Sequence, residues 1–146
     1  MTSYSYMGII ILLIFFPGCI NREWKYPPEG SFKWSIPTEI IDNNIVGILE
    51  ENSSSNLIIG IIEGFDQNSE DKLSYKISSQ INRSTNNTVN FFIIDFPHLI
   101  QPSPLNYESW NMNDSKYIDI NITVTDDSPT KENSNFILTL IITNVN

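Results

Sequence analysis

The chain has 146 residues, enough for one domain of ordinary size. Its hydrophobic residues (40%) and aromatic residues (12%) can supply a packed core, which argues against disorder throughout the chain. The formal net charge is −9, from 8 basic and 17 acidic residues, and such a chain repels the phosphate backbone of nucleic acids. With one cysteine and one histidine, it can build neither an internal disulfide framework nor a zinc cluster.

The beginning of the chain predicts a secretory signal peptide over residues 1–19. Residues 7–16 form an apolar run that is too short to span a bilayer and fits a signal-peptide core. Pro17, Gly18 and Cys19 follow, as a helix breaker and small residues. The alternatives are an uncleaved anchor and a lipid-modified Cys19. The polar residues 20–31 are expected to form a leader or linker.

The body of the chain has the pattern of β-strands. Alternation of apolar and polar residues is clearest over 118–124 and 136–143, and each segment predicts a strand with one buried and one solvated face. Shorter strands are expected at 44–50, 57–62, 73–77, 91–94 and 99–100, separated by turn-rich segments. Several short strands at such spacing predict an all-β sandwich or barrel.

Five Asn-x-Ser/Thr sequons support an extracellular glycoprotein, and they begin at Asn52, Asn82, Asn86, Asn113 and Asn121. Asn82 and Asn86 lie in a polar stretch and are expected to be used first.

Acidic residues stand at the ends of the expected strands. Glu51 precedes one strand, Asp66 follows it, Glu108 lies in a later loop, and Asp126 closes the segment 118–124. Calcium takes six to eight oxygen ligands from carboxylates, amides and carbonyls, and converging strand ends can supply them. From the composition alone, a calcium site and a set of solvated acidic loops are both open.

The order and spacing of these motifs resemble a cadherin repeat over residues 32–146. The matching segments are Glu51-Asn52, Asp66-Gln67-Asn68, Leu73–Ile77, Phe91–Asp95, Leu105–Glu108, Ile120–Ser128 and Asn144–Asn146. The resemblance implies a seven-stranded Greek-key β-sandwich, with the chain ending inside the linker between repeats. Asn68, Asn106 and Asn144 each replace an Asp of the family pattern, and Tyr107 replaces an Arg. Fewer charged ligands should weaken calcium binding.

The resemblance also implies two ligand sets, because cadherins hold calcium between successive repeats. The lower end of this repeat would contribute Glu51, Glu108, Asn144 and Asn146, and the upper end would contribute Asp66, Asn68 and Asp126. A rival register, in which residues 34–47 open the repeat, would make Glu39 the first-strand ligand instead of Glu51. Glu51 is favoured because it alone explains the position of Asp66-Gln67-Asn68. Each set needs an adjoining repeat, so the chain alone should bind calcium poorly.

The function implied by the resemblance is calcium-dependent, homophilic cell–cell adhesion. The expected partners are other cadherin-type proteins and an adjoining repeat, and the expected location is extracellular, either secreted or at the plasma membrane. The alternative is a secreted β-sandwich interaction module that needs no calcium. We expect no enzyme and no small-molecule substrate, because a glycosidase pair such as Glu51 and Glu108 would need a sugar cleft. His98 is expected to be a loop or strand-edge residue.

Overall fold

The computed structural model describes residues 26–106 and 116–145. These residues form nine β-strands and no helix. The strands are β1 (Glu29–Trp34), β2 (Thr38–Ile41), β3 (Asn44–Glu50), β4 (Leu57–Phe65), β5 (Ser74–Asn82), β6 (Ile93–Asp95), β7 (His98–Gln101), β8 (Tyr117–Thr125) and β9 (Asn133–Thr143). The predicted all-β sandwich is confirmed.

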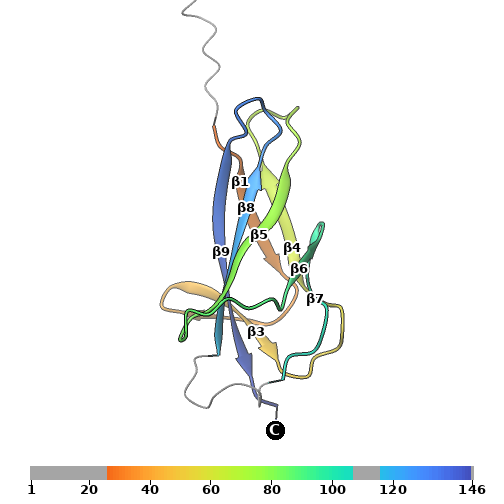
Figure 1. The fold of residues 1–146 in the computed structure, drawn as a ribbon, viewed down its shortest axis with the longest axis vertical. Helices are drawn as coiled ribbons and strands as arrows, with labels where there is room; N and C mark the ends of the chain where they lie inside the picture. Colours follow the sequence, from red (N-terminus) through yellow and green to blue (C-terminus); the bar gives the residue numbers. More distant parts are fainter. Residues whose placement is uncertain (1–25, 107–115, 146) are drawn as a thin grey trace, which may run out of the picture.

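Two sheets face each other along the long axis of the molecule (Figure 1). One has the strand order β1-β4-β7-β6, and the other has the order β2-β3-β9-β8-β5. Every pairing is antiparallel except that of β3 with β9, which is parallel. The strand count exceeds the predicted seven because the segment before β4 is divided into three strands. Pro37 separates β1 from β2, and a turn with positive φ at Asp42 and Asn43 separates β2 from β3.

The core lies between the sheets and follows the predicted alternation. In β8, Ile118, Ile120, Ile122 and Val124 are fully buried, while the residues between them are partly exposed. They pack with buried side chains of β9 and of the opposite sheet, including Leu140, Ile59, Ile62 and Leu99. Burying each such side chain contributes about 1.5–3 kcal/mol, so this pattern holds the two sheets together.

The expected strand at 91–94 is shifted, because a buried side chain intervenes. Gln80 is 6% exposed, and its Oε1 accepts hydrogen bonds from the backbone N–H groups of Phe91 (2.9 Å) and Phe92 (3.0 Å). Its Nε2 donates to the carbonyl of Phe92 at 2.7 Å. The Gln80 side chain thus makes the backbone hydrogen bonds that a neighbouring strand would otherwise make with residues 91 and 92. For this reason β6 begins only at Ile93.

The first strand, β1, begins at Glu29, inside the segment 20–31. Residues 29–31, expected in the leader, pair with β4, with Glu29 opposite Phe65. The Ser134 hydroxyl at the start of β9 donates a hydrogen bond to the carbonyl of Pro28. The predicted signal peptide lies outside the described residues. Within the described residues, no helix is long and apolar enough to cross a membrane.

Candidate cation site

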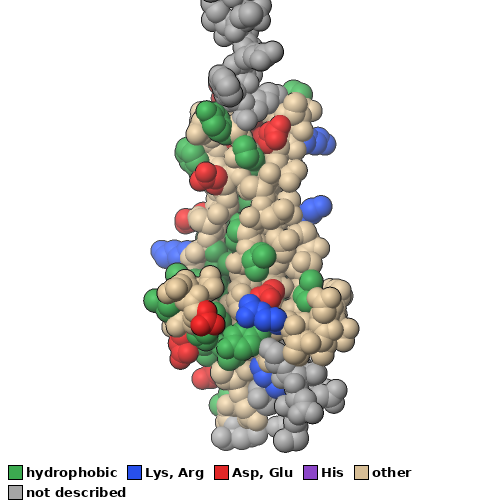
Figure 2. Space-filling model, turned by 90° about the vertical axis from the view of Figure 1, so that its left-hand side faces the viewer, with side chains coloured by type: hydrophobic (Ala, Val, Ile, Leu, Met, Phe, Trp, Pro, Cys, Tyr) green, Lys and Arg blue, Asp and Glu red, His purple; other side chains and the backbone are tan. Residues whose placement is uncertain are grey.

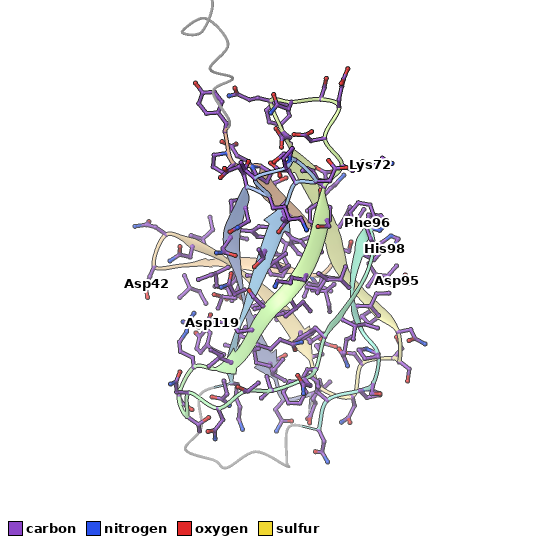
Figure 3. The ribbon with its side chains drawn as sticks, turned by 45° about the horizontal axis from the view of Figure 1, so that its top comes forward. Asp42, Lys72, Asp95, Phe96, His98 and Asp119 are labelled. Atoms are coloured by element: carbon purple, nitrogen blue, oxygen red, sulfur yellow. The ribbon has the colours of Figure 1, made fainter. Side chains whose placement is uncertain are left out.

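Two loops from different sheets meet at one end of the sandwich, the top of Figure 1. Residues 66–72 follow β4, and residues 126–132 follow β8; we call this pair of loops the upper end. The backbone N–H of Lys72 donates to Asp127 Oδ1 at 2.8 Å and ties the two loops together. Figure 3 shows Lys72 at this end, above the β6–β7 hairpin with Asp95, Phe96 and His98. The end is therefore assembled by the tertiary fold rather than by one sequence motif.

Three carboxylates converge at the upper end. One oxygen each of Asp66, Asp71 and Asp126 lies within 4.8 Å of the other two. Asp66 and Asp126 were predicted from the sequence, whereas Asp71 was not. The adjacent hollow, about 410 Å³ in volume, is lined by Asn68, Asp71 and Ser128 among others, so the predicted amide ligand lies beside the carboxylates.

Local turns hold two of these carboxylates in place. Asp66 Oδ1 accepts a hydrogen bond from the backbone N–H of Asn68 at 2.8 Å. Asp126 Oδ1 accepts from the N–H and the hydroxyl of Ser128 (3.1 and 2.6 Å) and from the N–H of Glu132 (3.0 Å). An Asp side chain that bonds the backbone two residues later stabilises a turn, so both side chains are oriented before any ligand arrives.

One oxygen of the cluster is buried without a partner. Asp66 is 9% exposed, and its Oδ2 makes no hydrogen bond within the described residues. Leaving a buried polar atom unpaired costs about 1–3 kcal/mol, and more when the group is charged. A carboxylate oxygen in that state is available to a ligand such as a cation.

The negative charges around Asp71 also favour a cation at the upper end. Desolvation, and then the negative charges of Asp126, Asp66 and Asp127, raise the pKa of the Asp71 carboxyl above its ordinary value of 3.8, although a hydrogen bond with the Asn68 side chain opposes the shift. A negative charge at this position is therefore less favourable than on a carboxyl in water. A cation nearby would reverse that preference.

The residues of the upper end fit a hard divalent cation. Carboxylate and amide oxygens are the ligands that calcium prefers, and Asp66, Asp71, Asp126 and Asn68 supply such oxygens. The described residues contain neither a histidine nor a cysteine at this end, which disfavours zinc. The two loops therefore define the residues that could hold the ion.

The opposite end brings together part of the lower set of predicted ligands. Glu51 is 5% exposed, its N–H donates to the carbonyl of Thr143 (3.0 Å), and its Oε1 accepts from the N–H of Val145 (3.2 Å). The N–H of Asn52 donates to the carbonyl of Leu105 at 2.9 Å. We call residues 51–56, 102–106 and 143–145 the lower end. Asn144 lies in it, whereas Glu108 and Asn146 lie outside the described residues.

The rival register concerns Glu39, which lies elsewhere. Glu39 is exposed on β2, opposite Val46 of β3. Glu51 is the glutamate that contacts the end of β9. Of the two glutamates, Glu51 is thus the one that lies at the lower end.

Comparison with known proteins identifies the fold. No protein-family model matches the chain, and no curated protein sequence matches it either. Solved structures do match: Drosophila N-cadherin EC1-3 (TM-score 0.59, 17% identity, 84% of this chain and 35% of that one) and protocadherin gamma B2 extracellular cadherin domains 3-6 (0.57, 17%, 82% and 25%). Mouse protocadherin-24 EC1-3 is similar (0.55, 14%, 80% and 34%). The chain spans a quarter to about a third of these structures. It has the fold of a cadherin repeat, as its motifs predicted.

Proposed function

We propose that this chain is a calcium-dependent cell–cell adhesion module of the extracellular space, and that Asp66, Asp71, Asp126 and Asn68 hold calcium at its upper end. The observation that carries the proposal is the unpartnered, buried Oδ2 of Asp66 within the group of three carboxylates. The cadherin-repeat fold supports it, because the same fold occurs in protocadherin and N-cadherin ectodomains. No enzymatic activity is part of this proposal.

The residues of the upper end divide the work between them. Hydrogen bonds from Asn68, Ser128 and Glu132 hold the carboxylates of Asp66 and Asp126 in orientation. Asp71 lies in the same loop as Asp66. In that loop, the backbone N–H of Lys72 donates to Asp127, which belongs to the loop of Asp126, and this bond ties the two loops together. A bound calcium ion would supply the positive charge that offsets the repulsion among these groups. The two loops would then move as one rigid end.

At the lower end, Glu51 and Asn144, with Glu108 and Asn146, form the second proposed ligand set. That set would be completed by an adjoining repeat. The upper end contains three carboxylates of this chain, so it should bind calcium alone, at the weak extracellular end of the range, with a Kd of about 1 mM.

An apolar surface on one sheet supports adhesion between copies of the chain or with related cadherin-type proteins. Ile40, Ile45 and Ile137 are 77%, 58% and 65% exposed and belong to strands β2, β3 and β9, which are neighbours in one sheet. Ile45 and Ile137 line one hollow of this surface. Figure 2 shows hydrophobic side chains exposed beside acidic and basic ones on one face of the molecule. Exposed apolar side chains on adjacent strands are typical of protein contact sites.

The test is clustering of beads that carry the full chain. We expect clustering in about 2 mM calcium, loss of clustering with a chelator, and loss with Asp66→Asn. Ile137→Lys should abolish clustering but leave the calcium response of thermal melting intact. Asp95→Asn, at the end of β6 in the other sheet, is the matched control and should cluster like the wild type. Clustering that ignores the chelator would favour the calcium-independent interaction module, and absence of clustering would refute homophilic adhesion.

A further inference from the structure

Four of the five sequons lie within the described residues, and the structure divides them into two pairs. Asn52 and Asn86 are exposed, and each has a positive φ in a turn (54° and 56°), a conformation that Asn tolerates well. The hydroxyl residues of their sequons, Ser54 and Thr88, are exposed too. Within the described residues, neither Asn side chain takes part in a hydrogen bond. Both amides are therefore accessible from solvent.

Asn82 is in a different state, because its side chain holds the turn after β5. It is 6% exposed, and its Oδ1 accepts hydrogen bonds from the N–H and the hydroxyl of Ser84, both at 3.0 Å, and from the N–H of Thr85 at 3.4 Å. Ser84 is the hydroxyl residue of the same sequon. A sugar on the Asn82 amide would have to displace this network.

Asn121 is enclosed on the sheet. It lies in β8, between β5 and β9, and its Oδ1 is inaccessible to solvent and has no hydrogen-bond partner in the described part of the chain. The hydroxyl residue of its sequon, Thr123, donates to Asn135 Oδ1 at 2.6 Å. The Oδ1 of this half-buried residue is thus turned into the sheet, and the side chain is less accessible than those of Asn52 and Asn86.

We infer that Asn52 and Asn86 carry N-linked glycans in the folded protein and that Asn82 and Asn121 do not. In the transfer step, the Asn Nδ2 forms a bond to C1 of the first sugar of a lipid-linked oligosaccharide and loses one proton. The bond from C1 to the pyrophosphate oxygen breaks, and the lipid pyrophosphate leaves. The structure thus separates Asn82 from Asn86, which the sequence ranked together. The inference rests on the extracellular location in the proposed function.

The two glycans would leave the upper end clear. Asn52 belongs to the lower end, directly after Glu51, and its N–H is bonded to Leu105. Asn86 follows β5, at the turn where its N–H donates to the carbonyl of Asn82. Neither upper-end loop, 66–72 or 126–132, contains a sequon.

The experiment is expression of the full chain in eukaryotic secretory cells, followed by enzymatic deglycosylation in heavy-oxygen water and peptide mass spectrometry. Released glycans leave heavy-oxygen Asp at their sites. We expect this label at positions 52 and 86, and its absence at 82 and 121. Ser54→Ala and Thr88→Ala should each remove one glycan-sized step of gel mobility. Ser53→Ala is the matched control and should keep the glycan, because the sequon does not depend on that position.

A failure of the glycosylation inference and a failure of the proposed extracellular location give different results. Label at Asn82 or Asn121 at an occupancy comparable to that of Asn86 would overturn the inference. A secreted chain without glycans at 52 and 86 would also overturn it while leaving the extracellular role intact. A chain that stays in the cell without any glycan would overturn both the inference and the proposed location.

Discussion

Replacing Asp66 by Asn should have opposite effects on stability without and with calcium. The Asn side chain keeps an Oδ1 that can accept the hydrogen bond from the N–H of Asn68, so the turn after β4 is preserved. The substitution removes one negative charge from a group of three carboxylates whose oxygens lie within 4.8 Å of each other. Without calcium, the variant should therefore be more stable than the wild type.

The size of both effects follows from the geometry. Two unit charges 4.8 Å apart repel by roughly 1 kcal/mol in water and roughly 3.5 kcal/mol at an effective dielectric constant of 20. Since the upper end is partly open to solvent, we expect Asp66→Asn to raise the free energy of unfolding by about 1 kcal/mol, or about 3–5 °C in Tm. In about 5 mM calcium, a Kd of about 1 mM would stabilise the wild type by about 1 kcal/mol, or about 3–5 °C. The variant should lose most of this gain.

The assay is thermal unfolding followed by circular dichroism, with a chelator and then with calcium. The control is Asp42→Asn, because Figure 3 shows Asp42 on the β2–β3 hairpin, away from the upper-end loops, and its φ of 50° suits Asn. The control should respond to calcium like the wild type. The reasoning is refuted if the wild type gains no stability up to several millimolar calcium, or if Asp66→Asn responds as strongly as the wild type. A variant less stable than the wild type without calcium would contradict the charge repulsion.

Three further substitutions test other parts of the structure. Asp71→Asn should raise Tm at neutral pH without calcium, and this difference should vanish below pH 3.8, because a carboxyl whose pKa is raised by folding is then protonated in both states. Arg83→Met should cost about 1 kcal/mol at most at pH 7, since its ion pair with Asp119 (2.6 Å) is partly exposed. Burial raises the pKa of Asp119, but hydrogen bonds, chiefly from Arg83, bring it below 3.8, so the cost should disappear as pH falls through that lowered pKa. Gln80→Leu should cost about 2 kcal/mol or more in urea unfolding, because it leaves buried backbone groups, including both of Phe92, unpaired.

The fold could be predicted from the sequence because its main signal is local. Alternation over 118–124 and 136–143 reports directly on one buried face of β8 and of β9. Motif order then placed Asp66 and Asp126 at strand ends. Asp71 could not be found in this way. It lies in a loop of polar residues, next to Glu70, and only the contact between two loops 55 residues apart at Lys72 and Asp127 selects it.

Side chains that replace backbone partners were also invisible in the sequence. The run 91–94 has the composition of a strand, but Gln80, eleven residues earlier, takes the hydrogen bond of Phe91. Asn82 lies in a polar stretch that predicts exposure, yet its side-chain Oδ1 accepts hydrogen bonds from the following turn, and the residue is only 6% exposed. In both cases a side-chain amide makes hydrogen bonds to the backbone, and these bonds change the local structure that the apolar and polar pattern predicts.

The two ends of the sandwich differ in a way that predicts which of them gives the proposed calcium response. At the lower end, Glu51 already accepts a hydrogen bond from Val145, whereas at the upper end Asp66 has a buried oxygen with no partner among the described residues. Glu51→Ala should therefore lower the free energy of unfolding by about 1 kcal/mol, because the hydrogen bond from the Val145 N–H to Glu51 Oε1 is lost. The loss should be the same with and without calcium, so that the increase in Tm on adding calcium equals that of the wild type. Melting curves of Glu51→Ala and Asp66→Asn, recorded side by side with calcium and with a chelator, test this assignment. If Glu51→Ala abolishes the calcium increment and Asp66→Asn retains it, calcium binds at the lower end, and the upper-end carboxylates merely repel each other.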